Sequence, residues 1–342
     1  MGRLLGLMTA WAGAVFWAVG LTRLQSSTEP VGEEMASNNT YWARDLRWMA
    51  IVAVAVAFVV AARSSAAGLG RVRSWCLVAG FTVVVAADLV CDRLDVTATI
   101  PIAAGAVAVA TAGWLALTRS GPVRSARAAD PDGARGPAAG PARGLVLAAA
   151  VAAATMPLAA AIESPTDTEA SLDPAAIGVG ALLAAAWLSA MLAAAPSRRR
   201  RVLAIALAVT AVAAVVLLRQ IAPGARFGAM SVFGAAALTV TTLMDWDWDR
   251  REAWWRYPVV LFSALLGYPF AVVLTVLLGT VLPVPAIITG LAGSPPVNGA
   301  DTDTLFALTG VLTGLAAGWI IRRSGGGRSL DGVAEVRAVE LR

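Results

Sequence analysis

The sequence contains no lysine and no histidine, and all 27 of its basic residues are arginine. Without lysine, the chain cannot form a Walker A motif, whose lysine reaches the phosphates, or a Schiff-base site. Without histidine, it cannot hold haem through an imidazole, build a zincin helix or assemble a Ser-His-Asp triad. These absences exclude whole classes of enzyme. We therefore expect no cofactor, no metal site and no catalytic residues of these types, and favour a function other than catalysis.

Cysteine and charged residues are also scarce. Cys76 and Cys91 are 15 positions apart in one expected helix, which separates them by about 22 Å, too far for a disulfide. Only 14% of the residues are charged and 58% are hydrophobic, whereas about 25% of the residues in a soluble domain are charged. This composition predicts a protein of the membrane.

Ten long apolar runs divide the chain. A bilayer core about 30 Å thick is crossed by roughly 20 apolar residues in a helix. We predict an all-α, polytopic bundle of ten transmembrane helices over residues 1–323, with a flexible linker at 119–143 and a short tail at 324–342. The expected spans are 4–21, 48–62, 74–91, 99–118, 144–162, 175–195, 202–218, 227–244, 257–282 and 304–321.

The arginines are distributed unevenly between the loops. If the N-terminus and every second loop share one side, that side holds 21 of the arginines and nine of the 22 acidic residues, a net charge of +12. The opposite side carries −7. Because arginines beside spans are retained in the cytoplasm, we predict that both termini are cytoplasmic and that the protein lies in the plasma membrane. Topology accounts for the basic charge, so we expect the lipid bilayer as a partner and no nucleic acid.

One apolar segment is too long for the assumption that each apolar run is a single span. Residues 257–300 contain no charged residue and would be roughly 66 Å long as a helix. A second crossing here would place the C-terminal arginines on the wrong side. We therefore predict one helix to about Leu282 and then an outer Gly/Pro-rich stretch, Pro283 to Asn298, which is either an ordinary loop or re-entrant.

The acidic residues at the end of the third span are the clearest ionisable group within an apolar run. Asp88, Asp92 and Asp95 follow at i, i+4 and i+7, so a continuous helix would place them on one face. Arg219 ends the seventh span at a similar depth, and we expect it to pair with Asp88 or Asp92. Such a pair fits a substrate or ion path, but the same residues also fit the outer membrane interface, where arginine side chains extend toward water.

Two prolines lie inside expected spans. Pro157 and Pro269 each remove a backbone hydrogen bond and favour a kink, which can expose carbonyl oxygens to a substrate. Neighbouring helices can equally satisfy those groups, which gives a purely structural interpretation. Small residues such as Gly178 and Gly180 indicate close helix packing.

A tryptophan-rich segment follows the eighth span. It combines aromatic rings with both signs of charge, as an aromatic belt at the headgroup boundary does. The alternative is a docking site for a protein partner, since tryptophan and arginine are frequent interface anchors. Oxygen ligands for a divalent cation are present too, without a defined geometry. The candidate docking residues are Trp246, Trp248, Trp254 and Trp255.

The first outer loop is acidic, with Glu29, Glu33, Glu34 and Asp45 near Tyr41 and Trp42. In this one respect it resembles the membrane glycosyltransferases that use lipid-linked sugars, which carry an acidic catalytic residue in an early outer loop. It departs from them because the loop is short and no soluble sugar-binding domain follows the bundle. The other interpretation is a solvated acidic loop.

Three functional hypotheses follow. The first is a permease or exporter component for a small molecule, based on the span number, the outer charges and the prolines. The second is a non-catalytic assembly or regulatory subunit that binds another protein or forms an oligomer. The third is an enzyme that acts on a lipid-linked substrate through the outer carboxylates.

Overall fold

The computed structural model describes residues 1–28, 41–63, 71–119, 140–163, 169–195, 197–245, 256–294 and 304–326. These ranges contain helices and no strand. The helical elements are α1 (Gly2–Val19), the π-helical turn η1 (Gly20–Leu24), α2 (Gln25–Thr28), α3 (Trp42–Arg63), α4 (Arg71–Arg93), α5 (Thr99–Arg119), α6 (Gly140–Ala161), α7 (Glu169–Ala194), α8 (Arg198–Arg219), α9 (Pro223–Asp245), α10 (Arg256–Val281), α11 (Val284–Ala292) and α12 (Thr304–Gly326).

The expected all-α architecture is confirmed. Each of the ten apolar runs coincides with a long helix, and eight helices in the described ranges are long and apolar enough to cross a membrane. The other two runs correspond to α4 and to α12, whose apolar part is the shorter stretch Leu305–Ile320. The chain is a multi-pass membrane protein, and ten remains an approximate count of its spans.

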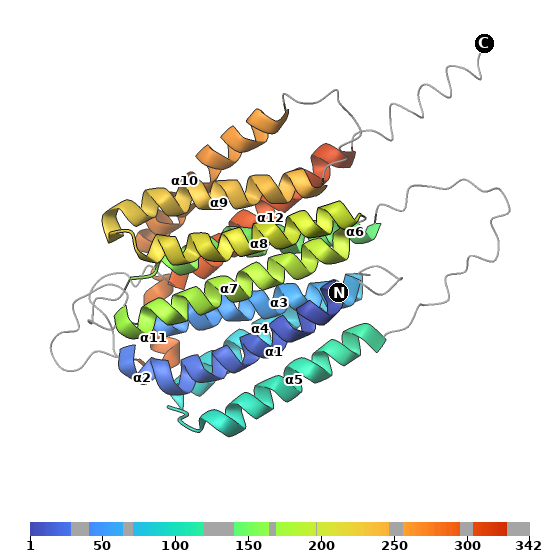
Figure 1. Cartoon of the computed structure of the whole chain (residues 1–342). Helices are drawn as coiled ribbons and strands as arrows, with labels where there is room; N and C mark the ends of the chain where they lie inside the picture. The colour runs from blue at the N-terminus through green and yellow to red at the C-terminus, as the bar shows by residue number, and fades with distance from the viewer. Residues whose placement is uncertain are drawn as a thin grey trace, which may run out of the picture.

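The long helices run side by side and alternate in direction (Figure 1). At one end of the bundle α1, α4, α6, α8 and α10 finish, and α3, α5, α7, α9 and α12 begin. We call this the α11 end, because α11 lies there. The opposite end, where the N-terminus lies and the four consecutive arginines begin α8, we call the arginine end.

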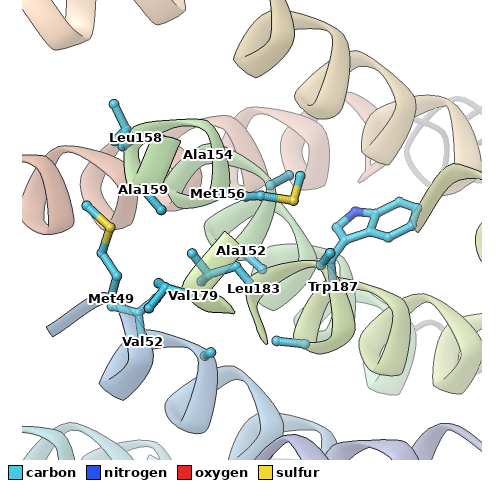
Figure 2. Close-up of a cluster of buried hydrophobic side chains, with 14 of the residues drawn as sticks. Met49, Val52, Ala152, Ala154, Met156, Leu158, Ala159, Val179, Leu183 and Trp187 are labelled. Carbon is cyan, nitrogen blue, oxygen red and sulfur yellow. The ribbon is translucent and has the colours of Figure 1, made fainter. Parts of the chain in front are cut away.

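Helix α6 occupies the centre of the bundle. Its alanine-rich sequence is buried along almost its whole length, and it packs against α3, α7, α9 and α12. Figure 2 shows side chains of α3, including Met49, meeting those of α6 and α7 in this core. From α7, Trp187 extends toward α9, where its indole N–H donates to Thr241 Oγ1 at 2.8 Å. Small side chains on α6 let several helices approach one axis.

Glycines set the closest helix contacts. Gly310, Gly314 and Gly318 of α12 recur every fourth residue and face α6; a Cβ on Gly314 would lie only 2.7 Å from the carbonyl oxygen of Ala150. Between α7 and α8, a Cβ on Gly180 would lie 2.7 Å from Val215 Cγ1. The predicted role of small residues in tight packing is confirmed at Gly180. Gly178 has ordinary spacing, 3.7 Å from the Phe16 ring.

The stretch after α10 differs from the expected irregular loop. Helix α10 ends at Val281, and Val284–Ala292 form α11. Gly293 ends α11 with a φ of +74°, the left-handed conformation that glycine adopts without strain. Pro285 near the helix start is compatible with a helix because the first turn needs no N–H donors. The predicted linker is also shorter than expected, because α6 already begins at Gly140.

Candidate functional site

Four charged side chains meet between α3 and α4 at the α11 end. Arg44 Nε donates to Asp92 Oδ2 at 2.8 Å, and Arg47 Nε donates to Asp88 Oδ1 at 2.8 Å. Arg47 Nη2 also lies 3.1 Å from Asp92 Oδ2. We call Arg44, Arg47, Asp88 and Asp92 the ion-pair cluster. Both arginine side chains and that of Asp88 are fully buried, and the Asp92 side chain is 2% exposed.

The pairing follows from the helix directions. Because α3 begins and α4 ends at the α11 end, the first arginine of α3 is level with the last acid of α4. Arg44 and Arg47 are three residues apart, and Asp88 and Asp92 are four apart, so each pair lies on one helix face about one turn apart. Two arginines one turn apart therefore meet two aspartates one turn apart.

Asp88 accepts more hydrogen bonds than an ion pair requires. Besides Arg47, the indole N–H groups of Trp17 and Trp48 donate to its carboxylate at 2.7 and 2.9 Å. Burying a carboxylate is costly unless it is paired and hydrogen-bonded, and these three donors supply both. The two indole rings also cover the carboxylate with apolar surface. Asp88 is thus held by α1 and α3 together.

Further contacts extend the cluster to neighbouring elements. Arg47 Nη1 donates to Gln25 Oε1 of α2 at 2.6 Å, and Arg44 Nη2 donates to Ser294 Oγ just after α11 at 2.6 Å. The Arg44 guanidinium also lies 4.7 Å from the centre of the Tyr41 ring. The cluster therefore links α1, α2, α3, α4 and the segment after α11. Two buried nitrogen atoms at this site, Arg44 Nη1 and Gln25 Nε2, still have N–H groups without an acceptor among the described residues.

The predicted face of three aspartates is wrong at its third member. Helix α4 ends at Arg93, and Asp95 follows in a turn with a φ of +48°. Asp95 is exposed there, away from the buried face that Asp88 and Asp92 share. Arg93 is also exposed and donates to the Leu291 carbonyl of α11 at 3.4 Å. Because Asp95 lies two residues beyond the helix end, it does not keep the helical register.

Arg219 does not pair with Asp88 or Asp92. It lies at the end of α8, where its Nε donates to Asp173 Oδ1 of α7 at 2.7 Å. Its Nη1 donates to the carbonyl oxygens of Ala160 and Ile162, where α6 ends. The expectation failed because α8 packs against α7 and α6, whereas α4 packs mainly against α3 and α11. Arg219 satisfies carbonyl groups that the end of α6 leaves free.

The two predicted prolines lie inside their helices, Pro157 in α6 and Pro269 in α10. Next to Pro269, the buried Tyr268 side chain donates to the Ala154 carbonyl oxygen at 2.7 Å. These residues connect α10 with the core helix. They do not meet the ion-pair cluster, since α3 packs between α4 and α6. The structure brings Asp88 and Asp92 together and leaves Arg219, Pro157 and Pro269 elsewhere.

Several other predicted residues fall outside the described ranges or change place. The candidate docking tryptophans at 246, 248, 254 and 255 and the acids Glu29, Glu33 and Glu34 lie outside the described residues. Asp45, expected in a solvated outer loop, is fully buried in the first turn of α3. Tyr41 and Trp42 are buried beside it. The start of α3 therefore lies six residues before the expected span and is part of the protein interior.

Sequence reasoning missed the two arginines of the cluster, which it placed in a loop. The available signal was their spacing: Arg44 and Arg47 precede an apolar run at i and i+3, and Asp88 and Asp92 end the next run at i and i+4. Two successive helices are antiparallel neighbours when the loop is short. In the described ranges, no three His, Cys, Asp or Glu side chains gather as metal ligands would.

Comparison with known proteins identifies no relative. No family model matches the chain, and neither a curated protein nor a solved structure matches it significantly.

Proposed function

We propose that the protein is a permease or exporter component for a small polar solute, and that α4 with α11 forms its gate at the α11 end. One observation supports this proposal above the others. In residues 77–93 of α4, Asp88 is the one fully buried residue; Phe81, Val85 and Leu89 pack against the core while only partly buried, and Val83 and Val90 are exposed. The most deeply buried contacts of this part of α4 are those of its carboxylates, beside apolar packing that is only partly buried.

An attachment through buried ion pairs favours two discrete positions of α4, one in which the ion pairs are formed and one in which they are separated. Coulomb attraction between buried charges is strong, and separating them is favourable only when water or a solute takes over their hydrogen bonds. Apolar packing, in contrast, weakens gradually as surfaces part. A polar solute that reaches Arg44 and Arg47 can replace the carboxylates, so that binding and opening are coupled.

Helix α11 belongs to the same movable part. It packs against α4, and the Arg93 side chain of α4 lies beside Gly293 at its end. It contacts the rest of the bundle through Ser294, whose hydroxyl accepts from Arg44, and through Ile288, which belongs to the main apolar core. Breaking the cluster would thus remove the buried polar contacts that hold α4 and the end of α11 to α3. Under the predicted topology, this gate faces the outside of the cell.

Movement of α4 is testable by distance measurement. In the full chain with Cys76 and Cys91 replaced by alanine, spin labels at V83C and V109C occupy exposed positions on α4 and on α5, a helix that packs against α1 and α3. In lipid nanodiscs, electron–electron resonance should give one main distance for this parent protein. The gate proposal expects a second distance when the cluster is weakened.

The variant D88N/D92N removes both negative charges of α4 from the cluster, and D95N is its control at an exposed position in the turn after α4. Liposomes with the purified protein are loaded with small anions, zwitterions and cations, and their release is followed by mass spectrometry. We expect release of at least one class above that of empty liposomes, changed by about tenfold or more in D88N/D92N and unchanged in D95N. No release from either protein, together with an unchanged spin-label distance, would contradict the proposal.

A further inference from the structure

A shallow groove lies on the surface of α8 at the arginine end, far from the ion-pair cluster. The described residues that line it are Arg198, Arg199, Val202, Leu203 and Ala206. The two arginines stand at the end of the helix, and the three apolar residues follow toward the middle of the span. Val202 is 59% exposed and Leu203 is 41% exposed, so the groove faces the surroundings of the bundle.

The spacing places these side chains on one stripe of the helix. Residues 199, 202, 203 and 206 follow at i, i+3, i+4 and i+7, so they share one face. Side chains on a helix lean toward its N-terminus, which directs the guanidinium groups of Arg198 and Arg199 past the helix start and toward water. The stripe has a cationic head and an apolar body about 10 Å long. A phospholipid has the matching form.

Arg198 and Arg199 have no ion pair within the described residues. Four arginines follow one another at Arg198–Arg201, and the first turn holds no acidic residue. Guanidinium groups on adjacent residues repel one another, and an anionic group from outside the chain would offset this repulsion. Basic clusters beside a span commonly attract anionic lipid headgroups.

We infer that this groove binds one anionic phospholipid, whose phosphate pairs with Arg198 and Arg199 and whose acyl chain lies along Val202, Leu203 and Ala206. The inference is independent of the proposed gate, since it concerns another helix and the opposite end of the bundle. It assigns a lipid site to the arginine end. The function of the four arginines then goes beyond orienting the chain in the membrane.

Native mass spectrometry of the full chain, titrated with phosphatidylglycerol or phosphatidylcholine, tests this site. We expect the first phosphatidylglycerol to bind the wild-type protein at least tenfold more tightly than the first phosphatidylcholine. The variant R198Q/R199Q should bind phosphatidylglycerol about 30-fold more weakly, which corresponds to about 1 kcal/mol for each arginine. Glycerol phosphate, which has the headgroup charge and no acyl chain, should not displace the lipid at equal concentration.

The control variant R3Q/R201Q removes the same charge from the same end of the bundle at two exposed arginines that do not line the groove. It should keep the wild-type affinity for phosphatidylglycerol within about threefold. Equal binding of the two lipids by the wild-type protein would overturn the inference, as would an equal loss in both double variants. If R198Q/R199Q does not fold, L203N tests the apolar half of the same groove and should weaken phosphatidylglycerol binding without changing the charge.

Discussion

The α6–α12 interface and the α3–α4 interface join helices in opposite ways. In the first, three glycines of α12 lie against the backbone of α6, and no charged group takes part in the contacts that they make. In the second, two arginines meet two aspartates, and the apolar residues among positions 77–93 of α4 are exposed or only partly buried. Close packing against glycine leaves little room for the two helices to shift. Charged groups, in contrast, can separate when other polar groups take over their hydrogen bonds. The bundle therefore combines a rigid centre with an edge suited to movement.

The largest loss of stability should come from a side chain placed in the glycine contact between α12 and α6. Gly314→Leu places a side chain where even a Cβ would touch the α6 backbone, and overpacking of this kind costs about 3 kcal/mol or more. We expect little monodisperse protein in size-exclusion chromatography. Gly105→Leu on α5, where nothing lies within 4 Å, is the control and should be close to wild type. Equal yields of the two variants would show that the centre is not rigid.

The next effect concerns the cluster itself. Asp88→Ala leaves Arg47 buried beside two indole N–H groups without their acceptor, and should lower the free energy of unfolding by about 3–5 kcal/mol in SDS titration. Removing both charges in D88A/R47M should restore a large part of that loss, because no unpaired charge remains. A double variant that is less stable than either single one would mean that the cluster contributes net stability and is no labile contact.

A smaller effect is expected at the second ion pair. Asp173 is 40% exposed on its side chain, so Asp173→Asn should cost no more than about 1 kcal/mol. Arg219→Gln should cost about 2–3 kcal/mol, because it also removes the donors to Ala160 and Ile162. SDS titration of both variants measures this asymmetry. A larger loss of stability for Asp173→Asn than for Arg219→Gln would mean that the ion pair, and not the contact with the end of α6, provides the stability.

The smallest effect should appear at the end of α11. Gly293→Ala forces a Cβ into a left-handed position 3.1 Å from Arg93 Cγ, at a cost of roughly 1–2 kcal/mol. Amide hydrogen exchange in residues 284–292 should become faster while that of α6 stays unchanged. Gly290→Ala, with open space at its Cβ, should leave the exchange of α11 as it is or slow it. If Gly293→Ala made amide hydrogen exchange faster throughout the bundle, α11 would belong to the rigid centre together with α6.

Local pattern predicted the helices well and their partners poorly. An apolar run of about 20 residues forms a helix in a membrane whatever its neighbours are, because each backbone N–H must find a carbonyl within the segment. The expected pairing of Arg219 with Asp88 or Asp92 needed α8 beside α4, and no periodicity within one helix contains that information. The start of α3 was missed for a related reason: Arg44 and Arg47 are typical of a loop until their partners on other elements are known.

The sequence by itself determined the class of this protein, the positions of its long helices and the excess of arginine at one end. The absence of lysine and histidine also excluded several kinds of catalytic chemistry. Only the tertiary structure decided that Asp88 joins Arg47, Trp17 and Trp48, and that Arg219 holds the end of α6 through Asp173 and two carbonyl oxygens. The physical reason is that apolar burial acts on each segment separately, whereas a buried charge is stable only with partners, and those partners come from other helices.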